Sequence, residues 1–510
     1  MKYAIELVGI TKRFARTVAN DNVTLSVSAG SIHALVGENG AGKTTLMETL
    51  YGIYQPDSGK IRIHDTEVAI KSPQDSIRQG IGMVHQHFML VPTLSVLENI
   101  ILGAEDTRNA FLDLAKTSER ITALADKFSL SVPLNEKVQD LGVGIQQRVE
   151  ILKALYRKAD ILILDEPTAV LTPQESTRLF GILSELKQQG KTIVLITHKL
   201  NEVMEISDRV SVMRKGKIVG EMDTPTTSPQ EIAELMVGRP VLLRVEKSKA
   251  NTGKPVLSIS NLSYVDRRGV EILKNVNFSV ASGEILGIAG VEGNGQTQLV
   301  ECITGLVKPT SGTISLNGVN LVGFPVKRVF DSGLAHVPED RLKRGLVVDF
   351  TVKENLILGL HTRQEFNSRL SMRRSAIEQN ARMLIKKYDV RPDDPDAIAR
   401  GLSGGNQQKV IIARELSRNA QLIVASQPTR GVDIGGTEFI HRSIISERDK
   451  GKAVLLISAD LTEVLSLSDR IAVIYDGMIV KIFPDNKVEE SELGLFMTGT
   501  KGNGREASLA

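Results

Sequence analysis

The stretch that decides the fold is Ser31-Ile-His-Ala-Leu-Val-Gly37-Glu38-Asn39-Gly40-Ala41-Gly42-Lys43-Thr44-Thr45-Leu46. An apolar run predicts a buried strand, and a glycine-rich loop then leads into a helical pattern. The loop fits the pattern GxxxxGK[ST], in which backbone N–H groups and the start of the following helix bind phosphate. We therefore expect residues 37–45 to bind the phosphates of a nucleotide.

Four residues predict what happens to the bound phosphates. Lys43 is placed to neutralise β- and γ-phosphates, and Thr44 to bind Mg²⁺. Further along the chain, the apolar run 161–164 ends in Asp165 and Glu166. Asp165 would complete the Mg²⁺ shell, and Glu166 would act as the general base or orient the attacking water. An apolar run ending in two acids is by itself usually just a strand end; beside a phosphate loop it indicates hydrolysis.

The same blocks occur twice in the chain, in the same order. HALVGENGAGKTTL at 33–46 matches LGIAGVEGNGQTQL at 286–299, and LGVGIQQRVEILKAL at 141–155 matches LSGGNQQKVIIAREL at 402–416. The separation grows from 253 residues (33 to 286) to 261 residues (141 to 402), so the second copy carries a small insertion. We predict a first domain at 1–243, a linker at 244–255, a second domain at 256–498 and a flexible tail at 499–510.

Each copy alternates buried strands with helical patterns, which predicts an α/β fold with a mostly parallel sheet. Residues 92–158 read as helices inserted between the phosphate loop and the strand that ends at Asp165. The predicted fold class is therefore two tandem P-loop NTPase domains, each with an inserted helical subdomain.

The composition narrows the classes of function. The 63 basic and 60 acidic residues leave a net charge of +3, which argues against a dedicated nucleic-acid-binding protein. A single cysteine, Cys302, excludes an intrachain disulfide and a cysteine-rich metal site. The sequence also lacks a signal-peptide core and any apolar run of the ~20 residues that a membrane span needs.

With these motifs in place, the chain resembles the ABC ATPases over nearly its whole length. The resemblance implies that Phe14 stacks on adenine, that Gln86 touches Mg²⁺ and reports to a transporter, and that His198 is the switch histidine. It also implies that Leu402-Ser-Gly-Gly-Asn-Gln407 is the signature motif. In that family, Ser403, Gly404 and Gly405 would contact the γ-phosphate held by the opposite domain.

The family's head-to-tail geometry collects every defect of this sequence in one composite site. The first site keeps all its residues. The second site lacks the groups that hydrolysis needs. In the second copy, Gln296 replaces the loop lysine, Glu339 replaces the Q-loop glutamine, Ser426 and Gln427 replace the two strand-end carboxylates, and Ala459 replaces the switch histidine. In the first copy, Gly142 replaces the signature serine. Because these groups supply the electrostatic stabilisation of phosphoryl transfer, the sequence predicts one catalytic and one degenerate site.

Within the family, the segments PEDRLKRG at 338–345 and QPTRGVD at 427–433 resemble the ATP-binding subunits of carbohydrate and nucleoside importers, and 83–103 resembles their nucleoside branch. This resemblance implies ATP and Mg²⁺ as cofactors, and two permease subunits and an extracellular or periplasmic solute-binding protein as partners. It implies a peripheral location on the cytoplasmic side of the cell membrane. Two alternatives are a soluble translation-associated ABC ATPase, which typically has two competent sites and a long charged linker, and a nucleotide-dependent regulator.

Overall fold

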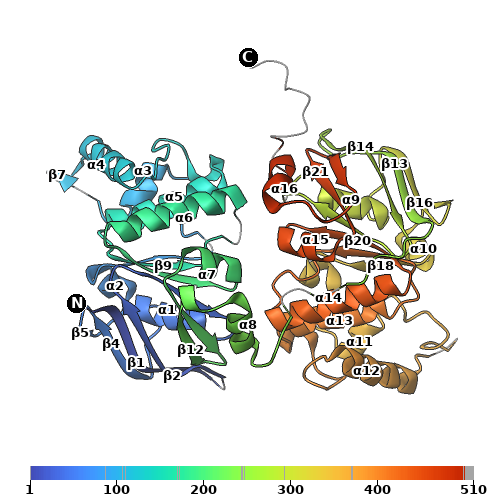
Figure 1. The fold of residues 1–510 in the computed structure, drawn as a ribbon, viewed down its shortest axis with the longest axis horizontal. Coiled ribbons are helices and arrows are strands. Elements are labelled where there is room, and N and C mark those ends of the chain that lie inside the picture. The colour runs from blue at the N-terminus through green and yellow to red at the C-terminus, as the bar shows by residue number, and fades with distance from the viewer. Residues whose placement is uncertain are drawn as a thin grey trace, which may run out of the picture. The chain divides into compact units, whose positions relative to one another are not determined.

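The computed structural model describes residues 2–15, 17–86, 88–105, 107–108, 111–168, 171, 173–242, 245, 247–291, 293–368, 371–497 and 499. The chain divides into two compact units, Met1–Val241 and Leu242–Ala510 (Figure 1). Among the described residues, no helix combines the length and the apolar character that crossing a membrane requires.

The first unit is built on two sheets. A four-stranded antiparallel sheet has the order β2-β1-β4-β5, and a six-stranded sheet has the order β12-β11-β3-β10-β9-β6. In the larger sheet all neighbouring strands are parallel except β11 and β12. The strands are β1 (Tyr3–Phe14), β2 (Thr17–Ser28), β3 (Ile32–Gly37), β4 (Ser58–Ile63), β5 (Thr66–Val68), β6 (Ile81–Val84), β9 (Ile161–Asp165), β10 (Thr192–Thr197), β11 (Arg209–Arg214) and β12 (Lys217–Asp223).

Strands β3, β9 and β10 are buried at every position, as continuous apolar runs in a parallel sheet should be. The helices are α1 (Lys43–Tyr51), α2 (Pro73–Arg78), α3 (Val96–Ile101), α4 (Leu114–Lys127), α5 (Val143–Tyr156), α6 (Pro173–Gln188), α7 (Leu200–Ile206) and α8 (Pro229–Val237). Short elements are β7 (Thr107–Arg108), β8 (Phe111–Leu112), η1 (Val138–Asp140) and η2 (Thr224–Thr226). Helices α3, α4 and α5 fall within the predicted helical insertion between the phosphate loop and β9.

The second unit repeats this topology. Its sheets have the orders β14-β13-β16-β17 and β18-β19-β20-β15-β21-β22, so β15 occupies the place of β3. The strands are β13 (Pro255–Val265), β14 (Glu271–Ala281), β15 (Ile285–Ala289), β16 (Ser311–Leu316), β17 (Val319–Asn320), β18 (Leu334–Val337), β19 (Leu422–Ser426), β20 (Ala453–Ser458), β21 (Arg470–Tyr475) and β22 (Met478–Phe483). The predicted α/β class with two similar, mostly parallel sheets is confirmed.

The helices of the second unit include one π-helical turn, η3 (Arg341–Gly345), which begins two residues after Glu339. The others are α9 (Gln296–Ile303), α10 (Val326–Asp331), α11 (Val352–Leu356), α12 (Arg374–Tyr388), η4 (Ala399–Gly401), α13 (Gly404–Leu416), α14 (Ile434–Asp449), α15 (Leu461–Leu467) and α16 (Glu490–Met497). Helices α11, α12 and α13 pack together, as α3, α4 and α5 do in the first unit.

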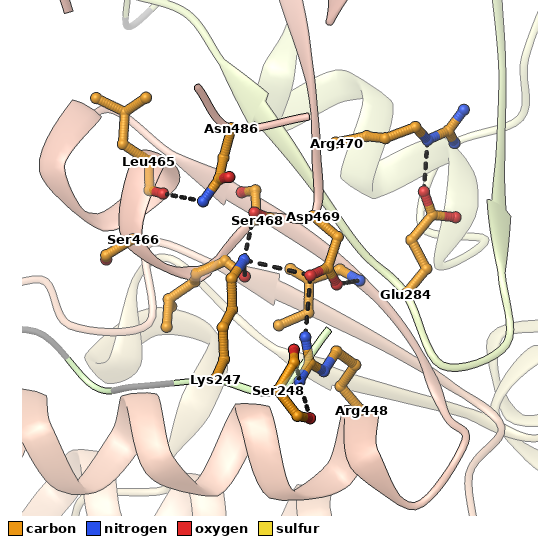
Figure 2. Close-up of polar contacts among 12 residues, drawn as sticks. Lys247, Ser248, Glu284, Arg448, Leu465, Ser466, Ser468, Asp469, Arg470 and Asn486 are labelled. Atoms are coloured by element: carbon orange, nitrogen blue, oxygen red, sulfur yellow. Dashed lines mark hydrogen bonds and ion pairs between the residues drawn. The ribbon is translucent and has the colours of Figure 1, made fainter. Parts of the chain in front are cut away.

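Part of the predicted linker 244–255 is fastened to the second unit (Figure 2). The Lys247 ammonium donates to the carbonyl of Leu467 at 2.9 Å and pairs with the Asp469 carboxylate at 3.3 Å. The Arg448 side chain, only 1% exposed, donates to Asp469 at 2.9 Å and to the carbonyl of Ser248 at 3.0 Å. A buried charge cluster therefore fixes residues 247 and 248 to the second unit.

Candidate functional site

The phosphate loop of the first unit joins the end of β3 to the start of α1. Gly42, with φ of 101°, precedes the helix, and a Cβ there would lie 2.2 Å from the carbonyl oxygen of Ala19. The Lys43 side chain is 6% exposed and donates to the carbonyls of Gly37 at 2.7 Å and Glu38 at 3.0 Å. Burial lowers the pKa of Lys43, against the attraction of Glu166 and Asp165. The loop thus folds around its own lysine.

Sequence reasoning missed one residue that supports this loop. Asn20, on β2, is fully buried and its amide donates to the carbonyl of Gly42 at 3.0 Å. Asn20 lies 22 residues before Gly42 and belongs to the other sheet, and its sequence surroundings contain no motif. The contact becomes visible only once the fold has brought β2 of the smaller sheet beside the phosphate loop.

The carboxyl ends of β9 and β10 bring the predicted acidic and histidine residues together. One oxygen of Glu166 lies 2.7 Å from His198 Nδ1, and the other accepts from the Gln86 amide at 3.0 Å. Burial opposes ionisation of Glu166, but the hydrogen bond and charge of His198, with Lys43, lower the pKa of this carboxyl. Glu166 therefore stays a carboxylate with both oxygens engaged.

Asp165 is the more buried of the two acids, at 4% exposure. Burial raises its pKa, while a hydrogen bond with the Thr44 side chain works in the opposite direction. The first unit thus places Lys43, Thr44 and Asp165 around one point, with Glu166, Gln86 and His198 beside it.

Phe14, the predicted adenine-stacking residue, ends β1 and is 38% exposed. Its ring meets the Tyr54 ring edge-to-face with centroids 4.9 Å apart, and the Lys12 ammonium lies 5.4 Å from its centroid. An exposed aromatic ring is available to a planar base, and its stacking role stays a prediction.

The second unit keeps the backbone of this site and changes its side chains. Gly295, with φ of 99°, precedes α9, which begins at Gln296 instead of a lysine. Gln427, the counterpart of Glu166, has the same φ of 47° as Glu166 itself. The Glu339 carboxylate pairs with Arg430 at 2.6 Å and accepts from the Thr297 hydroxyl at 3.4 Å. These contacts occupy the hydroxyl that corresponds to Thr44.

The signature residues lie at the start of α13 in the second unit. Ser403 is the exposed N-cap residue, and its hydroxyl accepts from the Asn406 side chain at 2.9 Å. Gly404 and Gly405 form the first turn. In the first unit, Gly142 takes the N-cap position of α5 and offers no side-chain hydrogen bond.

Comparison with known proteins agrees with this architecture. The family model for the ABC transporter matches residues 20–169 and 273–430. The guanosine import ATP-binding protein NupO of Bacillus subtilis is 49% identical over 500 residues, covering 98% of each chain. The nucleoside import ATP-binding protein NupA of Lactococcus lactis is 47% identical over 495 residues, covering 97% of this chain and 98% of its own.

A solved structure resembles the chain over both units. The archaeal ribosome recycling factor aABCE1, in complex with the ribosomal stalk protein aP1, gives a TM-score of 0.60 at 21% identity, covering 91% of this chain and 87% of its own. At that identity the likeness concerns the fold alone. The chain belongs to the ABC transporter family. It is an ATP-binding, ATP-hydrolysing member with two nucleotide-binding domains in one polypeptide.

Proposed function

We propose that this ATPase energises the import of a small solute, a nucleoside or a simple sugar, from the cytoplasmic face of the cell membrane. The observation that carries the proposal is the contrast between the units. In the first, the Glu166 carboxylate is held by Gln86 and His198 beside Lys43 and Asp165. In the second, both strand-end carboxylates are missing, but Ser403 is kept.

The proposed catalytic site is composite. Lys43, Thr44, Asp165 and Glu166 of the first unit would act on the nucleotide together with Ser403, Gly404 and Gly405 of the second. The remaining motifs, the loop at 290–296 and the signature at Gly142, would form a site without chemistry, because the lysine, the carboxylates and the signature serine are absent there.

The residues of the first unit fit Mg²⁺. The Thr44 hydroxyl and the Asp165 carboxylate share a hydrogen bond, so two hard oxygen donors already face one another beside the phosphate loop. Mg²⁺ prefers few protein oxygens, with substrate phosphates and water completing its shell. Thr44, Asp165 and Gln86 would hold the ion, which supplies charge neutralisation at the phosphates.

The hydrogen bonds of Glu166 suggest how the site becomes active. Both of its oxygens are engaged, one with His198 and one with Gln86. A water that Glu166 orients or deprotonates would have to share these oxygens with His198 and Gln86. If Gln86 turns toward the metal when nucleotide binds, its amide leaves Glu166 and that oxygen becomes available. Gln86 would thereby link occupancy of the site to activation of its base.

The relatives support the proposed cargo and partners. NupO and NupA are named for the import of guanosine and of nucleosides, and each matches this chain over nearly its whole length. By this likeness, the chain would work with two permease subunits and an extracellular or periplasmic solute-binding protein. The cargo itself would be selected by those partners.

The test is steady-state phosphate release by the purified full-length protein. Lys43→Ala and Glu166→Gln should each lower turnover at least about 100-fold, because they remove phosphate neutralisation and the base. Ser403→Arg should do the same, since a bulky cation would fill the γ-phosphate contact. The matched controls are Gln296→Ala and Gly142→Arg, which alter the degenerate site and should keep most of the rate.

Two outcomes would contradict the proposal. A large loss of turnover from Gln296→Ala would show that the second phosphate loop takes part in chemistry. Co-purification of the tagged chain with ribosomes, and not with membrane proteins, would favour a translation-associated ATPase over an importer subunit.

A further inference from the structure

Arg341, the first residue of the π-helical turn η3, touches the signature motif and the loop after β19. The Arg341 guanidinium donates to the carbonyl of Arg430 at 2.9 Å and approaches that of Gly431 at 3.5 Å. It also lies against the first residue of α13: a Cβ on Gly404 would come within 2.7 Å of Arg341 Nη2. Arg341 therefore fills the space between the start of α13 and the segment that follows β19.

The Arg341 side chain is closely packed and partly shielded from solvent. Its Nε atom is buried without a hydrogen-bond partner among the described residues. Burial lowers the pKa of its guanidinium, although Asp340 opposes this shift. The turn that carries Arg341 is held at both ends. At its start, the Asp340 carboxylate accepts from the backbone N–H groups of Leu342 and Lys343 at 3.0 Å. At its end, Gly345 packs so closely on α13 that a Cβ there would lie 2.4 Å from Ile411. π-Helical turns are rare and occur frequently at functional sites.

The contacts of Arg341 continue to the second phosphate loop. Arg430, whose carbonyl Arg341 contacts, pairs through its own side chain with Glu339, and Glu339 accepts from Thr297 at the start of α9. A chain of polar contacts thus runs from the degenerate loop to the residue against which Gly404 packs.

In the part of the first unit that the structure describes, the positions corresponding to Arg341 and Gly404 hold no equivalent pair. The two copies are 253 residues apart at this point of the repeat, so Phe88 of the first unit corresponds to Arg341 of the second. With the separation of 261 residues, Val143 stands where Gly404 stands, and its side chain is 40% exposed. The arginine and the glycine that makes room for it therefore occur together, in the unit that kept its signature serine.

We infer that Arg341 is a positioning residue for ATP hydrolysis: it sets the start of α13, and hence Ser403 and Gly404, against the loop that follows β19. The inference rests on the proposed composite site, since the signature matters to turnover only if it contacts the nucleotide bound at Lys43. Transition-state contacts tolerate little displacement, and a shift of about 1 Å can cost about 100-fold in rate.

The experiment uses the full-length protein and separates turnover from nucleotide binding. Arg341→Ala should lower kcat by about ten- to 100-fold, while the Kd of a fluorescent ATP analogue changes less than about twofold, because Lys43 and Phe14 lie in the other unit. Arg341→Lys keeps the charge but not the paired contacts, and should fall between Ala and wild type. The matched control is Lys343→Ala, on the same turn, whose side chain is 83% exposed.

A double substitution distinguishes positioning from general damage. Gly404→Ala alone should lower kcat, because its methyl group displaces the Arg341 guanidinium. In the pair Gly404→Ala with Arg341→Ala the guanidinium is gone and only the Gly431 carbonyl oxygen, 3.3 Å from the added Cβ, stays close, so turnover should be little lower than in Arg341→Ala alone. If the fold loss in kcat of the double variant equals the product of the losses in the two single variants, the two residues act separately and the inference is overturned.

Ser403→Arg, measured in parallel, keeps this inference distinct from the composite site. If Ser403→Arg abolishes turnover and Arg341→Ala leaves kcat intact, the composite site stands and the positioning role is refuted. If Ser403→Arg retains full turnover, both are refuted.

Discussion

Lowering the pH should weaken the strand that carries the phosphate loop, because β3 contains a buried histidine. His33 is 1% exposed, and burial, helped by Arg209, lowers its pKa from 6.5 to about 4. As the pH falls from 6.5 toward 4, His33 binds a proton in the unfolded chain but stays neutral in the folded chain. The free energy of unfolding is therefore unaffected by His33 above pH 6.5 and falls as the pH decreases from 6.5 to 4. At pH 5 the loss should be about 2 kcal/mol, and it should approach about 3 kcal/mol at pH 4.

Hydrogen exchange of peptides from β3 and β10 measures this loss locally, which matters because a chain of two units need not unfold in one step. Between pH 7 and pH 5, after correction for intrinsic exchange, the opening free energy of wild-type β3 should fall by about 2 kcal/mol more than that of His33→Gln. His361→Gln, at an exposed histidine of the second unit, is the control and should match wild type. If His33→Gln shows the same loss as wild type, His33 is not the group responsible.

Two further outcomes are expected. Asp469→Asn should destabilise the second unit by about 1.5–3 kcal/mol in urea unfolding, because it removes one of the two carboxylates that pair with the buried Arg448 and leaves only Asp449. Asp476→Asn, in an exposed ion pair, should cost less than about 1 kcal/mol. By resemblance to the importer ATPases, the apolar segment 88–92 would contact a permease, and Met89 in it is 62% exposed. Met89→Glu should therefore reduce permease association without loss of ATP turnover, whereas Leu90→Glu, at a side chain that packs on the core, should unfold the unit. Equal effects of the two substitutions within either pair would contradict these expectations.

The sequence predicts those parts of the site that are local in the chain. The strand, loop and helix around Lys43 lie where the apolar run and the glycines indicate, with β3 ending at Gly37 and α1 beginning at Lys43. The position of Glu166 at the end of β9 follows from its apolar run in the same way. Local patterns suffice here because the apolar run, the glycines and the start of the helix are each recognised from a few consecutive residues, although the strands that pair with β3 lie more than 150 residues further along the chain.

Contacts between distant segments could not be predicted in this way. Asn20 supports Gly42 from another sheet, and Arg341 reaches Gly404, 63 positions further along the chain. Asn20 belongs to no motif. Arg341 lies in the segment 338–345 that resembles the importer ATPases, but that resemblance gives no physical role for this side chain. The pairing of Glu339 with Arg430, which balances the charge of this carboxylate, could not be predicted either.

The two strand ends show which features of the site the fold itself maintains. Glu166 and Gln427 both have φ of 47°, in a region where non-glycine residues are uncommon, and a residue there costs of order 1–3 kcal/mol. In each unit the backbone N–H of this residue donates to the neighbouring strand, to Ile196 at 2.9 Å and to Ile457 at 2.7 Å. Since Gln427 keeps the conformation without the carboxylate, the sheet must impose it. The second unit has therefore lost the side chains of hydrolysis while keeping the backbone that would hold them, and that retained backbone is what places Arg430 beside Glu339 and gives Arg341 its carbonyl acceptors.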